Sequence, residues 1–335
     1  MRIRIITKMD WPSFRNVAMQ IREALSNRCS CTISDQTRAK TAGNILFIGT
    51  VLDQTLRLLG DFLGRSRIVF YGTTEGYSFV DEASLRIARQ IKIIAVSHFV
   101  KQMLEEIGIS VAGVVHHGLD MDNRRVDTQF YKALKRKFKN KKIILTTSAN
   151  HSRKGLDNLL NGYQIVEKEM ENAHLIVHSE PTGYYNMPKI IRDLELKHVW
   201  LTNLYGELSP SKLNALYKLC SLYVQPSYSE GFGLPVLEAF RFDKPVIAVD
   251  APPFNEIIRQ GENGILVSPS KITWFNFANQ VLFKMHMYRA EDLAQAMLEL
   301  LTKRQRVAKM RENIRKEKYG WSAHRLYPKL LDYFT

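Results

Sequence analysis

Cysteines, long apolar runs and metal-binding clusters are all scarce in this sequence of 335 residues. Its three cysteines, Cys29, Cys31 and Cys220, cannot build a disulfide framework, and we expect three free thiols. No run approaches the ~18 apolar residues of a membrane helix, which argues against an integral membrane protein. Residues Met1–Thr7 alternate in polarity like a first strand rather than a secretory signal, so the sequence predicts a cytoplasmic protein.

Acidic residues are also few relative to basic ones: the sequence has 48 Lys and Arg and 33 Asp and Glu, which gives a net charge of +15. The basic residues are spread along the chain, so no nucleic-acid partner is expected. The densest patch, Lys132–Lys142, has seven basic residues in eleven and carries Phe130, Tyr131, Leu134 and Phe138 at helical spacing. The favoured interpretation is a solvated linker helix, and the alternative is a helix that makes peripheral contact with a membrane surface or an acceptor.

Short apolar runs alternate with amphipathic stretches, a pattern that predicts βα units and parallel sheets in two domains. The predicted strands are Arg2–Thr7, Asn44–Gly49, Arg67–Gly72, Ile91–Ser97, Val111–His116, Lys142–Ser148, Ala173–His178, His198–Asn203, Ser221–Gln225, Pro245–Asp250 and Gly264–Val267. The predicted division is an N-terminal domain over residues 1–125, a basic linker over 126–141, a second domain over 142–315 and a C-terminal segment over 316–335.

The most informative segment follows the predicted strand Ser221–Gln225. Two glycines around one aromatic, Gly231–Gly233, precede Pro235 at the expected start of a helix, a position where proline costs no hydrogen bond. Backbone N–H groups at a helix N-terminus favour a phosphate or pyrophosphate. Glu230 and Glu238 lie on either side of this anion site, and carboxylates accept sugar hydroxyls. The local interpretation is a clamp for a nucleotide-sugar.

This segment resembles the E-x7-E motif of retaining glycosyltransferases of the GT-B fold, in family four, which use nucleotide-activated sugars. Ser152–Asp157 resembles the R-K-G segment of that family, and Lys244–Ile247, Asn255–Ile258 and Glu262–Val267 follow its C-terminal pattern. The resemblance covers about residues 90 to 335. It implies an α/β GT-B architecture in which two Rossmann-like, doubly wound parallel-sheet domains face a cleft.

The resemblance also assigns roles to residues of the second domain. It gives Glu230 a contact with the transferred sugar, and it gives Arg153 and Lys154 the stabilisation of the leaving diphosphate. The donor-binding set that it implies is Gly231, Phe232, Gly233, Leu234, Glu238, which faces the ribose, and Ser148, which stands where relatives often carry a basic residue.

The first domain departs from the family pattern. The loop Lys8–Ser13 has no glycine where relatives have a glycine-rich turn. Candidates for the cleft are Thr73, Glu75 and His117; Glu75 could position the sugar or the acceptor, or be a surface acid, and a structural role is favoured for His117. Trp321–Tyr327 resembles the closing helix of the family, which returns to the first domain.

We therefore expect a retaining hexosyltransferase that moves a sugar from a nucleotide-diphosphate-sugar to a glycan, lipid or protein acceptor, with departure and attack on one face. No D-x-D clamp is apparent, and GT-B enzymes generally bind no metal at the diphosphate, so we expect no metal and no cofactor. Alternatives are a sugar-nucleotide epimerase or hydrolase on the same fold, a glycosidase carboxylate pair, and a non-catalytic basic binding protein. Intact Lys154, Glu230 and Glu238 argue against the last.

Overall fold

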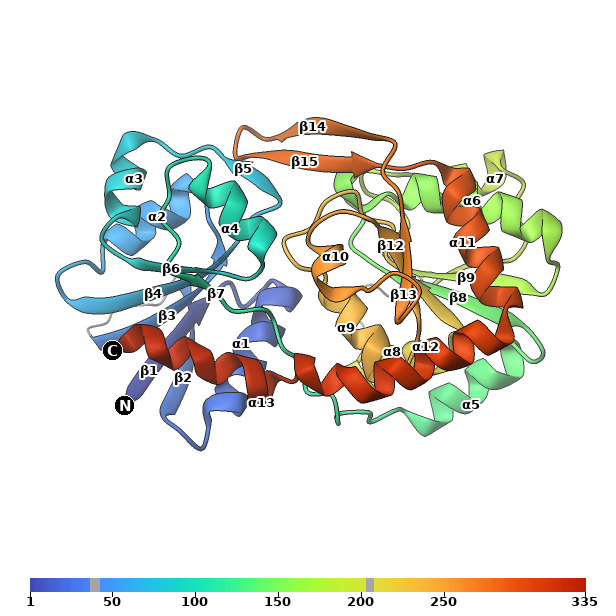
Figure 1. The fold of residues 1–335 in the computed structure, drawn as a ribbon, viewed down its shortest axis with the longest axis horizontal. Coiled ribbons are helices and arrows are strands. Elements are labelled where there is room, and N and C mark those ends of the chain that lie inside the picture. Colours follow the sequence, from blue (N-terminus) through green and yellow to red (C-terminus); the bar gives the residue numbers. More distant parts are fainter. Residues whose placement is uncertain (37–42, 203–207) are drawn as a thin grey trace.

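The computed structural model describes residues 1–36, 43–202 and 208–335 and shows two α/β domains side by side along the long axis of the molecule (Figure 1). Each domain is built on a six-stranded sheet in which all pairings are parallel. The predicted fold class is therefore confirmed. The end of one predicted strand, Asn203, lies outside the described residues.

The N-terminal domain contains a sheet of strand order β2-β1-β3-β4-β6-β7. Its strands are β1 (Arg2–Thr7), β2 (Ser30–Asp35), β3 (Gly43–Thr50), β4 (Ser66–Thr73), β6 (Lys92–Ala95) and β7 (Gly113–Val114). Its helices are α1 (Pro12–Leu25), α2 (Asp53–Gly60), α3 (Glu82–Ala88) and α4 (His98–Glu105). The strand predicted over Val111–His116 is only two residues long, and β2 was not predicted because only Cys31 and Ile33 are apolar in it.

The C-terminal domain contains a sheet of strand order β10-β9-β8-β11-β12-β13. Its strands are β8 (Lys142–Thr147), β9 (Ala173–His178), β10 (Val199–Leu201), β11 (Leu222–Val224), β12 (Val246–Val249) and β13 (Gly264–Val267). Its helices are α6 (Leu156–Glu169), α7 (Met187–Asp193), α8 (Pro210–Leu219), α9 (Leu234–Arg241), α10 (Phe254–Ile257) and α11 (Ala290–Thr302). The central strands are buried on both faces, which explains their continuous apolar runs.

The order of the second sheet reverses between β8 and β11. In open parallel sheets the crevice at such a reversal, beyond the carboxyl ends of the strands, is where ligands bind. The loop after β8 carries Arg153 and Lys154, and the loop after β11 carries Glu230. The topology alone therefore brings the two motifs of the sequence to one edge of the sheet.

An antiparallel hairpin that the sequence analysis did not predict joins the two domains at the top of Figure 1. Its strands β14 (Lys271–Phe277) and β15 (Val281–Met287) follow β13 of the C-terminal domain. Strand β15 pairs with β5 (Gly76–Ser78) of the N-terminal domain, so one three-stranded sheet contains segments of both domains. We call β14 and β15 the bridging hairpin.

The C-terminal segment crosses back along the lower edge of both domains (Figure 1). It begins within α12 (Arg304–Glu317), which starts before the predicted boundary at residue 316, and continues through η3 (Lys318–Trp321), α13 (Ala323–Leu326) and η4 (Tyr327–Phe334). The Tyr327 hydroxyl donates to the carbonyl oxygen of Gly118 at 2.9 Å, and Arg67 donates to that of Phe334. Helix α13 and η4 thereby complete the packing of the N-terminal domain.

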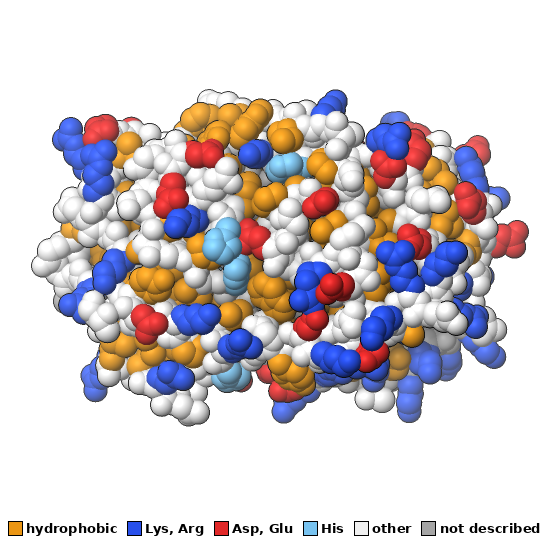
Figure 2. Space-filling model, in the orientation of Figure 1, with side chains coloured by type: hydrophobic (Ala, Val, Ile, Leu, Met, Phe, Trp, Pro, Cys, Tyr) orange, Lys and Arg blue, Asp and Glu red, His pale blue; other side chains and the backbone are white. Residues whose placement is uncertain are grey.

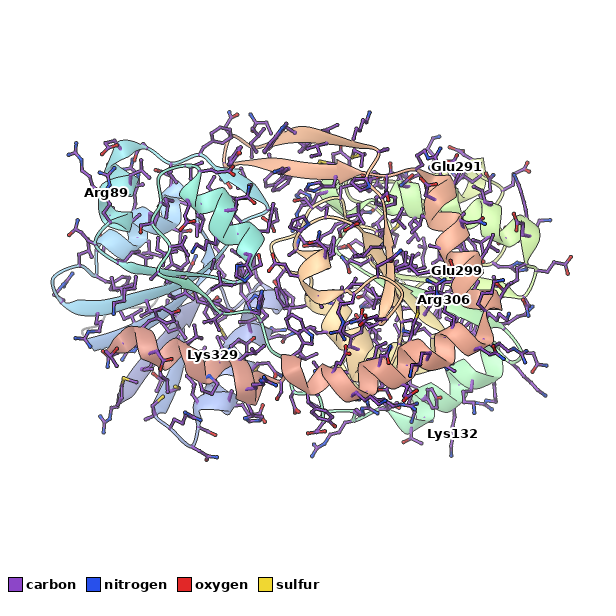
Figure 3. The ribbon with its side chains drawn as sticks, in the orientation of Figure 1. Arg89, Lys132, Glu291, Glu299, Arg306 and Lys329 are labelled. Atoms are coloured by element: carbon purple, nitrogen blue, oxygen red, sulfur yellow. The ribbon has the colours of Figure 1, made fainter. Side chains whose placement is uncertain are left out.

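The basic linker forms helix α5 (Thr128–Lys137), which packs against α8. Leu134 is buried, and Lys212 and Lys218 of α8 lie over the rings of Phe130 and Tyr131. Phe138 is buried against the Trp200 ring at 5.6 Å. The basic side chains stay in solvent, as Lys132 does in Figure 3. This arrangement favours the linker interpretation over insertion into a membrane.

The described part of the chain contains no helix with the length and apolarity of a membrane span. The three cysteines are free thiols, as expected.

Candidate active site

A tight turn after β8 presents the two candidate cations. Arg153 and Lys154 belong to the 3-10 turn Ser152–Lys154, which ends at Gly155 in the left-handed region with φ of 59°. A Cβ at Gly155 would overlap the carbonyl oxygen of Pro226. Glycine is therefore required for the turn to approach the loop after β11 this closely.

Glu230 is the centre of the site, and only 7% of its surface is exposed. Four side chains donate hydrogen bonds to its carboxylate. The donors are Arg153 Nη1 at 2.7 Å, Ser227 Oγ at 2.8 Å, Gln225 Nε2 at 3.2 Å and Lys154 Nζ. A buried carboxylate with two cationic partners is held in one orientation and stays ionised.

The pKa shifts in the cluster follow from burial and from the paired charges. Burial alone would raise the pKa of Glu230, but the Arg153 and Lys154 charges lower it to about 2. Burial and repulsion by Arg153 lower the pKa of Lys154, and attraction to Glu230 opposes the shift. Burial, then the Arg153 and Lys154 charges, lower the pKa of the neighbouring His151 to about 4. His151 is therefore neutral at pH 7, whereas Glu230 is ionised.

The N-terminal domain contributes Glu75 to the same cluster. Arg153 Nη2 donates to Glu75 Oε1 at 2.8 Å, and the Ser229 hydroxyl donates to the backbone oxygen of Glu75 at 2.7 Å. Arg153 thus lies between one carboxylate from each domain. Two cations, Arg153 and Lys154, face two carboxylates, Glu75 and Glu230, so the charges within the cluster nearly balance.

The loop Gly231–Gly233, which we call the glycine loop, packs directly against the N-terminal domain. A Cβ at Gly231 would overlap the hydroxyl of Thr73, and the hydroxyl of Ser97 donates to the Gly231 carbonyl at 2.7 Å. Gly233 precedes helix α9 with φ of 102°, a conformation that disfavours other residues. Among the described residues no side chain caps the amino end of α9, so its backbone amides and its field are available to a ligand in the crevice.

The second carboxylate, Glu238, has a separate partner. It lies on α9 and accepts a hydrogen bond of 2.6 Å from the Tyr217 hydroxyl, which also contacts Thr147 Oγ1 at 2.7 Å. Glu230 and Glu238 therefore do not form one hydrogen-bonded pair. Ser148, buried at the end of β8, donates to the adjacent Ala149 carbonyl at 2.9 Å.

His117 supports the loop from behind. Its Nδ1 lies 3.0 Å from the Tyr71 hydroxyl, and its ring meets Phe232 edge-on at 5.2 Å. Burial, together with the nearby His116, lowers the pKa of His117 to about 3, so it is uncharged. These contacts agree with the structural role that the sequence analysis favoured for His117.

Sequence reasoning missed several contributors to the cluster. Ser227 and Gln225 orient Glu230, Ser97 binds the glycine loop, and the guanidinium of Arg153 lies over the Phe283 ring of the bridging hairpin at 5.6 Å. The spacing of Ser227, three residues before Glu230, was a local signal. No local sequence signal marked Phe283, because its position depends on how the hairpin folds back over the crevice.

Comparison with known families decides the class of the protein. Residues 127–317, more than half of the chain, match the family model described as glycosyl transferases group 1. The chain belongs to this family. The matched region contains both motifs of the cluster, including Arg153, Lys154 and Glu230. The protein is accordingly a glycosyltransferase.

Two curated relatives of this glycosyltransferase differ in how much they share with it. An uncharacterized glycosyltransferase of Sulfolobus islandicus rod-shaped virus 1 is 24% identical over 93% of this chain and 95% of its own length. The MMP alpha-(1->4)-mannosyltransferase of Mycolicibacterium hassiacum is 30% identical, over 58% of this chain and 46% of its own length. The second match therefore covers only part of each chain.

Solved structures of GT-B glycosyltransferases share the whole fold. HepE of Anabaena, in complex with UDP and glucose, has a TM-score of 0.77 at 15% identity over 100% of this chain and 99% of its own. The sucrose-phosphate synthase of Thermosynechococcus elongatus has a TM-score of 0.74 at 14% identity, over 100% and 98%. At these identities the comparison establishes the GT-B fold of this glycosyltransferase.

Proposed function

We propose that the protein is a retaining hexosyltransferase that uses a nucleotide-diphosphate-sugar and works without a metal at the diphosphate. The observation that carries the proposal is the position of Glu230 between Arg153 and Lys154 at the reversal of the second sheet. Binding of UDP and glucose by HepE, which shares the fold, supports a donor of this class. The acceptor would be a glycan, a lipid or a protein, and the proposed location is the cytoplasm.

The charges in the cluster suggest how the leaving group is stabilised. The cations Arg153 and Lys154 are preorganised and largely shielded from water, so added negative charge on a departing diphosphate is stabilised without reorganisation. The amide groups at the amino end of α9 add a favourable field. Glu230 is ionised and rigidly held, which suits it to accept sugar hydroxyls rather than to donate a proton.

Retention follows in this proposal from attack on the same face from which the diphosphate leaves. Both oxygens of the Glu230 carboxylate are engaged by cations, a condition that makes it a poor nucleophile toward the sugar. Glu238 accepts a hydrogen bond from the Tyr217 hydroxyl, and its carboxylate can accept further hydrogen bonds. This is consistent with a contact between Glu238 and the ribose. The same separation of partners speaks against a glycosidase pair, whose carboxylates act across one bond.

A donor screen tests the proposal. Thermal unfolding is followed with UDP-, GDP- and ADP-sugars, because a ligand of the native state raises the unfolding temperature by mass action. One nucleotide series should stabilise the protein, and its sugar should then be transferred with the anomeric configuration retained, as read by NMR of the product. No stabilisation by any series, or a product of inverted configuration, contradicts the proposal.

Independence from metal is tested separately. Transfer should continue in EDTA, since cations and amides rather than a carboxylate pair are available to the diphosphate. Loss of turnover on chelation, restored by Mg²⁺ or Mn²⁺, would show that the diphosphate site has been misassigned.

A further inference from the structure

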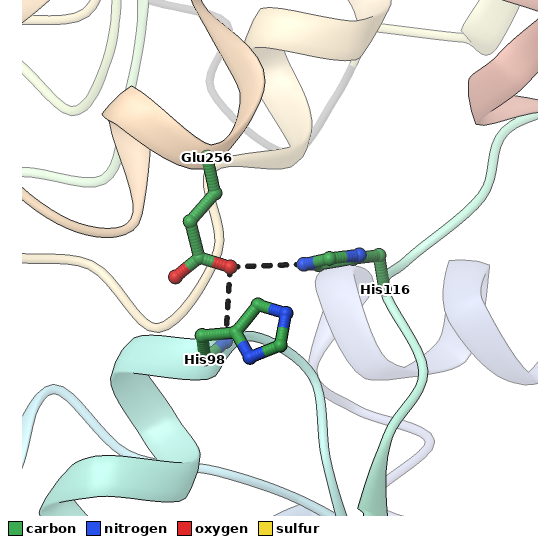
Figure 4. Close-up of side chains that lie close together, drawn as sticks. All are labelled: His98, His116 and Glu256. Carbon is green, nitrogen blue, oxygen red and sulfur yellow. Dashed lines mark hydrogen bonds and ion pairs between the residues drawn. The ribbon is translucent and has the colours of Figure 1, made fainter.

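A second cluster of ligating side chains lies at the seam between the domains, apart from Arg153, Lys154 and Glu230. Figure 4 shows His98, at the start of α4, His116, after β7, and Glu256, on α10. Their ligand atoms all lie within 4.8 Å of one another, and His116 Nε2 is 2.9 Å from Glu256 Oε2. Two ligands come from the N-terminal domain and one from the C-terminal domain.

Two members of the cluster are held in place by their surroundings. The Glu256 carboxylate accepts hydrogen bonds of 2.9 Å from the backbone amides of His98 and Phe99. The His116 ring packs against the rings of Trp321 at 5.5 Å and Phe232 at 5.9 Å. Ligands whose orientation is fixed before binding lose little freedom when a metal arrives.

We propose that His98, His116 and Glu256 bind a divalent transition metal, with Zn²⁺ as the best fit. Two imidazoles and one carboxylate form a common zinc donor set that leaves a fourth position open. Tetrahedral zinc places its ligand atoms about 3.4 Å apart. Binding therefore requires small shifts, because His116 Nε2 and Glu256 Oε2 are only 2.9 Å apart and must separate slightly. The His98 side chain, which is exposed and meets the His116 ring edge-on at 5.5 Å, must also adjust, since the ligand atoms now lie up to 4.8 Å apart.

The open position would face solvent. Figure 2 shows histidine side chains at the surface between the two domains. A shallow hollow of about 480 Å³, lined by His98, Lys101, Gln102, Glu105 and Glu106, adjoins the cluster on α4. A metal ion can therefore enter directly from water, and the fourth ligand is water.

A bound metal would stabilise the domain arrangement of this structure, which we call the closed form. The three ligands come together because α10 lies against the amino end of α4, so an ion held by all three would oppose separation of the two domains. By linkage, such an ion shifts the population toward the closed form. This role is distinct from the diphosphate chemistry, and both metal-free transfer and zinc binding can hold together.

The test uses the full chain, stripped with EDTA and studied without donor or acceptor, so its outcome is independent of the proposed function. Calorimetric titration with ZnCl2 should give one strong site per chain, and Co²⁺ should develop the visible absorption of a tetrahedral complex. His98→Ala should weaken Zn²⁺ binding at least tenfold and abolish the cobalt spectrum. His324→Ala, which removes an exposed histidine elsewhere, should change neither.

A second variant and two further measurements distinguish loss of a metal ligand from misfolding of the variant. In the wild type the amides of His98 and Phe99 donate to different oxygens of Glu256, so Glu256→Gln keeps an acceptor for only one of them while the anionic ligand is lost. Circular dichroism of this variant is therefore compared with that of the wild type to check that the fold persists. Zn²⁺ should reduce the radius of gyration measured by X-ray scattering and raise the unfolding temperature of the wild type, but of neither variant. Equal zinc binding by wild type and His98→Ala, or no stoichiometric binding at all, overturns the proposal.

Discussion

At the scale of single residues, we expect the ion pairs around Glu230 to contribute both to the stability of the fold and to catalysis. In Glu230→Gln, Arg153 and Lys154 lose the buried carboxylate that they share, and Arg153 keeps only Glu75 as an anionic partner. We expect transfer to fall below 1% of wild type and the free energy of unfolding at pH 7 to drop by on the order of 3 kcal/mol. Steady-state turnover and denaturant unfolding measure the two effects.

The pH dependence identifies the origin of that loss. The pKa of Glu230 falls from 4.5 to about 2 on folding, so its contribution is complete above pH 4.5 and disappears as the pH falls toward 2. The stability gap between wild type and variant should close over that range. The exposed Glu291→Gln serves as control and should show no gap. Near-normal turnover of Glu230→Gln would remove the role assigned to this carboxylate.

Lys154 gives an independent residue-scale prediction. Lys154→Ala should cost about 2–4 kcal/mol of transition-state stabilisation, which is a loss of roughly 30- to 1,000-fold in turnover. Calorimetry should also show weaker binding of the free nucleoside diphosphate, because one of the two cations is gone. Lys329→Ala removes an exposed lysine and should leave both quantities unchanged. Unaltered turnover and affinity in Lys154→Ala would reduce Lys154 to a structural partner of Glu230.

At the scale of elements, the bridging hairpin depends on one glycine. A Cβ at Gly76 would overlap the carbonyl oxygen of Leu282, so Gly76→Ala should push β15 away from β5. We expect a loss of about 1–3 kcal/mol in stability and faster hydrogen exchange at the amides of β15. Gly320→Ala is the control, since nothing lies within 4 Å of a Cβ there. Unchanged exchange in β15 would mean that the pairing contributes little.

The basic helix α5 gives an element-scale prediction about membranes. Its apolar residues already pack within the C-terminal domain, so attraction to acidic vesicles would rest on charge alone and would fade toward physiological salt. In co-sedimentation at physiological salt, wild type and a variant with Lys135, Arg136, Lys137 and Lys139 changed to Gln should behave alike. Binding that requires acidic lipid and is lost in the variant would restore the membrane interpretation.

The elements that the sequence predicted and those that it did not differ in physical character. Central parallel strands such as Ala173–His178 are buried on both faces and leave continuous apolar runs, so their bounds were predictable. The bridging hairpin carried a signal that was overlooked: an alternating pattern around Ala278 and Asn279, both with positive φ at the turn. The sequence of the edge strand β2 carried almost no signal for a strand.

At the scale of the whole molecule, the site could be predicted only in its local parts. The spacing of Glu230 and Lys154 in their motifs, with parallel-sheet topology, was enough to bring them to one crevice. The Glu75–Arg153 pair and the contact of His116 with Glu256 join the two domains. Such contacts depend on how the two domains dock, and no local pattern in the sequence encodes that geometry.

The return of the C-terminal segment to the N-terminal domain has a consequence for synthesis on the ribosome. Residues up to about 120 emerge early, yet Tyr327, Leu330 and Phe334, whose side chains pack there, are translated much later. At 5–20 residues per second, the first domain waits roughly 10–40 s for them. During that interval the surface that these side chains later cover stays exposed to other nascent chains and to chaperones. The N-terminal domain expressed alone would keep that surface exposed permanently.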